Sequence, residues 1–118
     1  MPLAFSPCVL IPCYNHGAMM PQVLARLQPF DLPCIVVDDG SDSSTRQQLE
    51  RLAAETANLT LIRLPQNAGK GAAVICGLQA AAQAGFSHAV QVDADGQHAI
   101  EDIPQLLALA QAHPEALI

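Results

Sequence analysis

The sequence has few aromatic residues and few basic ones. Aromatic residues make up 3% of the 118 residues and tryptophan is missing, so a core has to be built from aliphatic side chains and alanine. Only five residues are lysine or arginine, against eleven acidic ones, and the net charge is −6. Nucleic-acid grooves need clustered basic side chains to neutralise phosphates. We therefore expect no nucleic-acid partner, and a bound phosphorylated molecule would have to be held by a metal ion and backbone N–H groups.

Long hydrophobic runs and cysteine pairs are also missing. No apolar run approaches the roughly 20 residues that cross a membrane, and the N-terminus lacks the basic region and apolar stretch of a signal peptide. Cys8, Cys13, Cys34 and Cys76 form no C-x-x-C pair, which disfavours a zinc site and favours buried, reduced thiols. These features predict a cytoplasmic location and no membrane segment in this chain, although the whole protein could associate with the cytoplasmic face of a membrane.

Hydrophobic residues are abundant, at 51%, and many lie in four short β-rich runs. The runs cover residues 8–11, 34–37, 59–62 and 89–92. Such runs are typical of buried strands in a parallel sheet.

Helical patterns separate these runs. We expect helices over residues 20–27, from a capping box at Ser44 and Gln47 through Leu52, over 69–84 with Gly85 as the stop, and over 103–110. The predicted architecture is an α/β, Rossmann-like three-layer sandwich with a mostly parallel sheet, in one domain over residues 1–118. Residues 116–118 resemble the start of a fifth strand, so we expect the sheet to be cut short, and its uncovered edge predicts a homodimer or larger assembly.

Polar and turn-forming residues follow each predicted strand, at 12–17, 38–41, 66–71 and 93–98. Ligands of open α/β sheets bind beyond the carboxyl ends of the strands. We therefore expect these four segments to converge on one site.

Asp93 and Asp95 are separated by one residue, so in an extended segment their side chains point the same way. Two adjacent carboxylates repel unless a cation lies near them, and oxygen ligands suit Mg²⁺ or Mn²⁺. A D-x-D sequence alone would favour a solvated acidic turn, but its position at the end of a buried strand favours a metal and diphosphate site.

Two other strand ends each leave two interpretations open. Either Asp38 or Asp39 could bind a ribose hydroxyl or a base edge, and either could cap the following helix. Residues 67–71 open a helix with two glycines, which favours phosphate binding, but they do not form a Walker A loop. Lys70 could contact a diphosphate or be an ordinary exposed lysine, and Tyr14 could stack on a base or cover the sheet edge.

Taken in order, four segments resemble the N-terminal half of a family 2 glycosyltransferase with the GT-A fold. They are IPCYN at 11–15, VVDDGS at 36–41, NAGKG at 67–71 and DADGQH at 93–98, and the resemblance covers essentially the whole chain. The last segment is especially similar to the branch that includes polyprenol- and dolichol-phosphate sugar synthases.

The resemblance implies a UDP- or GDP-sugar donor and inverting transfer to an acceptor such as a polyprenol phosphate or a glycan. It implies nucleotide-binding roles for Pro12, Tyr14, Asn15, Asp39, Asn67, Lys70 and Asp93, and a Mg²⁺ or Mn²⁺ site formed by Asp93, Asp95 and Gln97. The acceptor half and the catalytic base are expected beyond Ile118, so the 118 residues alone should be inactive. The alternatives are a non-catalytic nucleotide-sugar-binding or interaction module and, less consistent with residues 12–15, a nucleotidyltransferase.

Overall fold

Four parallel strands form one sheet in the order β3-β2-β1-β4. The computed structural model describes residues 5–15, 17–93 and 100–112. The strands are β1 (Pro7–Cys13), β2 (Cys34–Asp38), β3 (Leu59–Arg63) and β4 (His88–Gln91). The α-helices are α1 (Met20–Leu27), α2 (Ser43–Glu55), α3 (Lys70–Gln83) and α4 (Ile103–Ala112), joined by the short 3-10 helices η1 (Gly17–Met19), η2 (Gln28–Phe30) and η3 (Ile100–Asp102).

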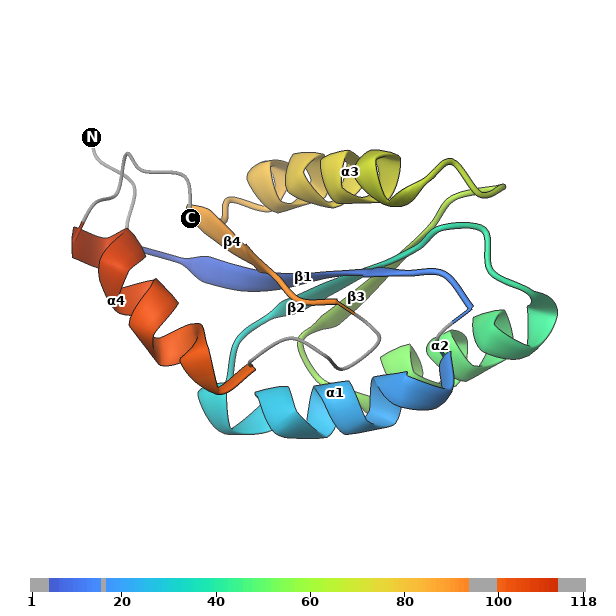
Figure 1. Ribbon diagram of the computed structural model, residues 1–118, viewed down its shortest axis with the longest axis horizontal. Helices are drawn as coiled ribbons and strands as arrows, with labels where there is room; N and C mark the ends of the chain where they lie inside the picture. Colours follow the sequence, from blue (N-terminus) through green and yellow to red (C-terminus); the bar gives the residue numbers. More distant parts are fainter. Residues whose placement is uncertain (1–4, 16, 94–99, 113–118) are drawn as a thin grey trace.

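The helices cover both faces of the sheet, which makes three layers (Figure 1). Successive side chains of β1 point to opposite faces of the sheet. Cys8 and Leu10 pack with the alanines of α3, whereas Val9 and Ile11 pack with the side chains of α1, α2 and α4. Helix α3 lies close to β1, because a Cβ added at Gly77 would stand 2.1 Å from Leu10 Cδ1.

The direction in which the chain builds the sheet reverses beside β1. From β1 the chain moves outward to β2 and β3, and α3 then carries it across the opposite face to β4 on the other side of β1. The paired register of β1 and β4 ends at Leu10 and Gln91, while β1 continues to pair with β2 as far as Cys13. Pro12, which lacks an N–H, lies beyond the last pair with β4. Such a switch point leaves a crevice at the carboxyl ends of the two strands, where open α/β sheets bind ligands.

The predicted fold is confirmed in its class, its parallel sheet and its four strands and four α-helices. The capping box at Ser44 is wrong, since α2 begins at Ser43 and its N-cap is Asp42, whose carboxylate accepts the Thr45 N–H at 2.9 Å. Ser44 is already the second residue of the helix, where its hydroxyl cannot serve the first turn. Gly85, with φ +89°, follows α3 as expected. The strand predicted at 116–118 lies outside the described residues, and no helix within the described ranges is long and apolar enough to cross a membrane.

Candidate functional site at the carboxyl edge of the sheet

The polar segments predicted to converge follow the carboxyl ends of the parallel strands. Tyr14 and Asn15 follow β1, and Asp39 follows β2. Asn67 lies between β3 and α3, Lys70 is the first residue of α3, and Asp93 follows β4. Pro12 is buried within β1, whereas Tyr14 is 45% exposed at the edge. Asp95 and Gln97 lie outside the described residues.

Asn15 ties the loop after β1 to the loop after β2. Its backbone N–H donates to Ser41 Oγ at 3.0 Å, and its Oδ1 accepts the Asp42 N–H at 2.8 Å. Asn15 has φ +57°, a left-handed conformation that asparagine tolerates better than most residues. Its side-chain oxygen therefore accepts a bond from the protein's own backbone, and these contacts hold the segment with Tyr14 beside the loop after β2.

Asp39 fixes the segment that enters α3. Its side chain is nearly buried, with 3% of the residue exposed. Oδ1 accepts the Ala68 N–H at 2.8 Å, and Oδ2 accepts the Gly69 N–H at 3.1 Å and Asn67 Nδ2 at 3.0 Å. The two backbone donors immediately precede Lys70, so the Asp39 carboxylate sets where α3 begins. Among the described residues Oδ1 accepts one hydrogen bond, which uses one of its two lone pairs.

Glycine is required beside this anchor. Gly40 has φ +72°, and a Cβ at this position would stand 2.3 Å from the backbone N of Asn67. The two loops can approach this closely only because residue 40 has no side chain.

Asp38 is fully buried and belongs to the scaffold. Its Oδ1 accepts the Ser41 N–H at 2.9 Å, and its Oδ2 lies 3.7 Å from Arg63 Nε. Arg63 Nη2 forms a second ion pair, with Glu50 Oε1. The alternative that Asp38 or Asp39 caps the following helix is wrong, because Asp42 takes that role. The roles of Ser41, Asp42 and Arg63 as partners were missed from the sequence. The one available signal for Arg63 was that it directly follows the third run, as Asp38 directly follows the second.

Lys70 and Asp93 meet across the switch point. The Lys70 ammonium lies 2.7 Å from Asp93 Oδ1, with the side chains 59% and 30% exposed. Gln91 Nε2 also donates to this oxygen at 3.4 Å. Lys70 is the first residue of α3, and a helix N-terminus favours anions. The site thus combines a carboxylate suited to a cation with an ammonium and a helix end suited to a phosphate.

Among the described residues, this site offers one of the predicted metal ligands, Asp93. No group of three or more His, Cys, Asp or Glu side chains with metal-binding spacing occurs among residues 5–15, 17–93 and 100–112. Asp93 offers a partly exposed carboxylate that already receives one cationic group, and hard divalent cations prefer such oxygens. Asp93 therefore fits a divalent cation as one ligand, with the other predicted ligands outside the described ranges.

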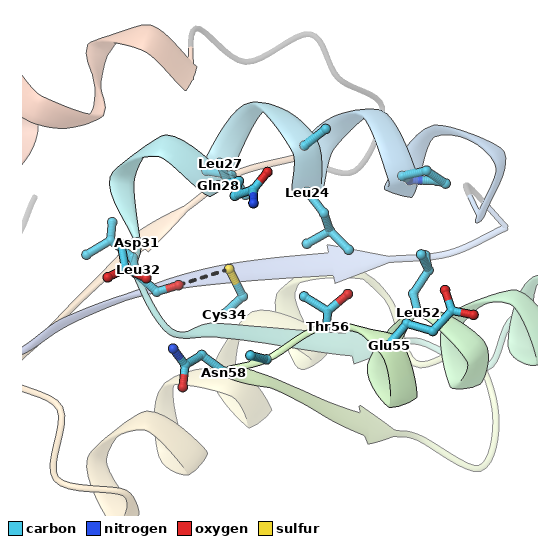
Figure 2. Close-up of a pocket in the computed structure, with 13 residues that line it drawn as sticks. Leu24, Leu27, Gln28, Asp31, Leu32, Cys34, Leu52, Glu55, Thr56 and Asn58 are labelled. Carbon is cyan, nitrogen blue, oxygen red and sulfur yellow. Dashed lines mark hydrogen bonds between the residues drawn. The ribbon is translucent and has the colours of Figure 1, made fainter.

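A hollow of about 460 Å³ lies at the opposite edge of the sheet, between the ends of α1 and α2 (Figure 2). Its wall includes Cys34, the first residue of β2, and Asn58, just before β3, together with the side chains of Asp31 and Glu55. The carboxyl ends of both helices face this region, and they disfavour anions. A nucleoside diphosphate therefore suits the carboxyl edge of the sheet and not this hollow.

Comparison with known proteins decides the family. The model of "Glycosyl transferase family 2" matches residues 8–118. The chain belongs to glycosyl transferase family 2. This membership argues against the nucleotidyltransferase alternative and accords with the three-layer parallel architecture.

Relatives of this family 2 chain include several transferases named for lipid phosphates. A polyprenol monophosphomannose synthase of Mycolicibacterium smegmatis is 33% identical over 113 residues, which cover 93% of the chain and 43% of the relative. An undecaprenyl-phosphate mannosyltransferase of Micrococcus luteus is 33% identical, with 83% of the chain and 41% of the relative covered. A UDP-N-acetylglucosamine–dolichyl-phosphate N-acetylglucosaminyltransferase of Methanococcus voltae is 35% identical, with 84% and 45% covered. The chain spans less than half the length of each.

A solved structure shares the fold of the family 2 chain. The mannosyltransferase PcManGT of Pyrobaculum calidifontis, in complex with GDP-Man and Mn²⁺, matches with a TM-score of 0.60 and 23% identity. The match covers 79% of the chain and 30% of PcManGT. At this identity the likeness supports the GT-A fold and nothing finer.

Proposed function

We propose that this chain forms the donor-binding part of an inverting glycosyltransferase that takes a sugar from a UDP- or GDP-sugar. The observation that carries the proposal is the meeting of Lys70 and Asp93 at the switch point of the sheet. A nucleoside diphosphate needs cationic partners, and a metal that bridges it to protein needs a carboxylate. Both kinds of group stand here at the edge where α/β sheets bind ligands.

The residues divide into those that bind and those that hold the binding groups in place. Tyr14 offers an exposed ring for the base at the end of β1, with Pro12 beneath it in the strand. Asp39 has one acceptor position left for the base, beside the bonds that anchor the α3 entry. Asn15 and Asn67 position these groups by their contacts with the β2 loop.

The diphosphate lies, in this proposal, beside Lys70 and Asp93 at the N-terminus of α3. Asp93, Asp95 and Gln97 would hold Mg²⁺ or Mn²⁺. The cation would supply positive charge that stabilises the departing nucleoside diphosphate. Lys70 and the N-terminal N–H groups of α3 add to that charge from the protein's side.

The acceptor that we propose is a polyprenol phosphate. The relatives from M. smegmatis, M. luteus and M. voltae are named for polyprenol, undecaprenyl or dolichyl phosphates, although their names differ in the sugar. We assign the acceptor site and the general base to residues beyond the 118, because the relatives are more than twice as long as the matched part. A general base there would deprotonate the attacking oxygen where the acceptor requires it. The chain alone should bind the donor without transferring its sugar.

Calorimetric titration of the chain with UDP and GDP, with and without Mn²⁺, tests the proposal. We expect binding that needs Mn²⁺, and an Asp93→Asn variant that loses it. Asp102→Asn is the matched control, because it removes the same charge from an exposed residue of η3. Equal binding with and without Mn²⁺ would favour a nucleotide-binding module without transferase chemistry. Sugar transfer by the chain alone would contradict the proposal that the acceptor site and the general base lie beyond the 118 residues.

A further inference from the structure

The ion pair between Lys70 and Asp93 joins two segments that the fold brings together from opposite sides of β1. Lys70 follows Gly69, whose N–H is held by Asp39, and Asp93 follows β4. The backbone before Lys70 is thus fixed by hydrogen bonds to the buried Asp39 carboxylate, whereas the Lys70 side chain is 59% exposed. The ammonium can leave Asp93 without any movement of α3.

We propose that Lys70 is an exchangeable counter-ion: it neutralises Asp93 before a divalent cation binds and gives up that carboxylate when the cation arrives. This inference rests on the proposed function of the site. An ammonium 2.7 Å from Asp93 Oδ1 occupies the kind of contact that a metal ligand would make. Like charges repel at such a distance, so Lys70 and the cation compete for this oxygen.

In this exchange the divalent cation first replaces the Lys70 ammonium at Asp93, and the freed ammonium then faces the diphosphate. An ion pair as exposed as this one changes an equilibrium by only about two- to fivefold, so a doubly charged ion can replace it. Lys70, once released, stands at the N-terminus of α3, where an anionic group of the donor is favoured. The same side chain therefore opposes the cation before the donor binds and assists the diphosphate afterwards.

The test measures Mn²⁺ binding and nucleotide binding separately in the full chain. Without nucleotide, Lys70→Gln should bind Mn²⁺ about two- to fivefold more tightly than the wild type, as followed by electron paramagnetic resonance of free Mn²⁺. With saturating Mn²⁺, the same variant should bind UDP or GDP roughly tenfold more weakly, because a charge-assisted contact is lost. Lys70→Arg, which keeps the charge, should stay within about twofold of the wild type in the Mn²⁺ titration.

Arg51→Gln is the matched control, since it removes one positive charge from an exposed position on α2. Opposite shifts of Mn²⁺ and nucleotide affinity in Lys70→Gln, both larger than in Arg51→Gln, would support the exchange. Mn²⁺ affinity that is equal in Lys70→Gln and Arg51→Gln, or reduced in Lys70→Gln, would overturn it while leaving the proposed function intact. A wild-type chain that binds no Mn²⁺ at all, with or without nucleotide, would overturn the proposed function and the exchange with it.

Discussion

The Asp39 anchor gives the sharpest mutational prediction. In Asp39→Asn, one of the two side-chain atoms becomes an NH₂ group that faces donors: the Ala68 N–H on one side, or the Gly69 N–H and Asn67 Nδ2 on the other. Hydrogen bonds to a charged group contribute about 1.5–3 kcal/mol each, and an unsatisfied buried donor costs about 1–3 kcal/mol. The variant loses the charge on all three bonds and leaves at least one donor unpaired, so we expect the free energy of unfolding to fall by about 3 kcal/mol.

Urea denaturation of the two proteins measures this loss, and hydrogen exchange locates it. The amides of Ala68 and Gly69 should lose protection in Asp39→Asn before the rest of the sheet does. Asp42→Asn is the matched control, because it removes the same charge from an exposed N-cap where asparagine serves as well as aspartate; we expect a change below about 0.5 kcal/mol there. Asp39→Asn as stable as Asp42→Asn, with unchanged exchange at Ala68 and Gly69, would refute the role assigned to this carboxylate.

Further predictions concern the glycines and the buried thiols. Gly40→Ala should destabilise the chain by about 2–5 kcal/mol in urea denaturation, because residue 40 has φ +72° and a Cβ there would clash at 2.3 Å. In Gly71→Ala, the control, the added Cβ meets nothing within 4 Å, so this variant should be neutral or stabilised by up to about 1 kcal/mol. Equal effects of the two substitutions would contradict the close approach of the loops at Gly40. Burial raises the pKa of Cys34 to about 11, and burial together with the neighbouring Cys34 raises the pKa of Cys8 to about 11. The unfolded chain releases these thiol protons near pH 9, whereas the folded chain keeps them to about pH 11. The free energy of unfolding therefore falls as the pH rises from 9 to 11, by at most about 2.7 kcal/mol per pH unit for the two thiols together. Urea midpoints measured from pH 8 to 11 should fall less steeply in Cys34→Ala than in the wild type, and identical slopes would argue against the two raised pKa values.

The fold could be predicted because local and long-range signals agree. Four β-rich runs separated by helical patterns leave little choice besides a parallel α/β sheet. The predicted strand boundaries differ from the observed ones by at most two residues. The convergence of polar strand ends follows from the same topology, since parallel strands place their carboxyl ends at one edge. The helix start at Ser43 was misjudged because a sequence pattern ranks Ser44 and Asp42 alike as caps.

The partner that each polar side chain contacts could not be predicted from the sequence. The sequence marks Asp38 and Asp39 as neighbours at a strand end, but pairing geometry decides that one turns to Arg63 and Ser41 and the other to the α3 entry. The contact of Lys70 with Asp93 depends on α3 crossing to the far side of β1, which periodicity alone does not specify. Polar residue types therefore predict a candidate site, whereas the partner of each side chain depends on the three-dimensional structure.

The central claim is that a divalent cation and a nucleoside diphosphate bind together at the carboxyl edge of the sheet. Nuclear magnetic resonance of the isotope-labelled chain, titrated with Mn²⁺ in the presence of GDP or UDP, tests it directly, because the paramagnetic ion broadens the amide signals nearest to it. The account predicts that the signals of Gly40, Gly69 and Asp93 broaden first and that those of Asp31 and Asn58, beside the hollow at the other edge, stay sharp. Broadening centred on Asp31 and Asn58, or none at any of these five amides, would contradict it.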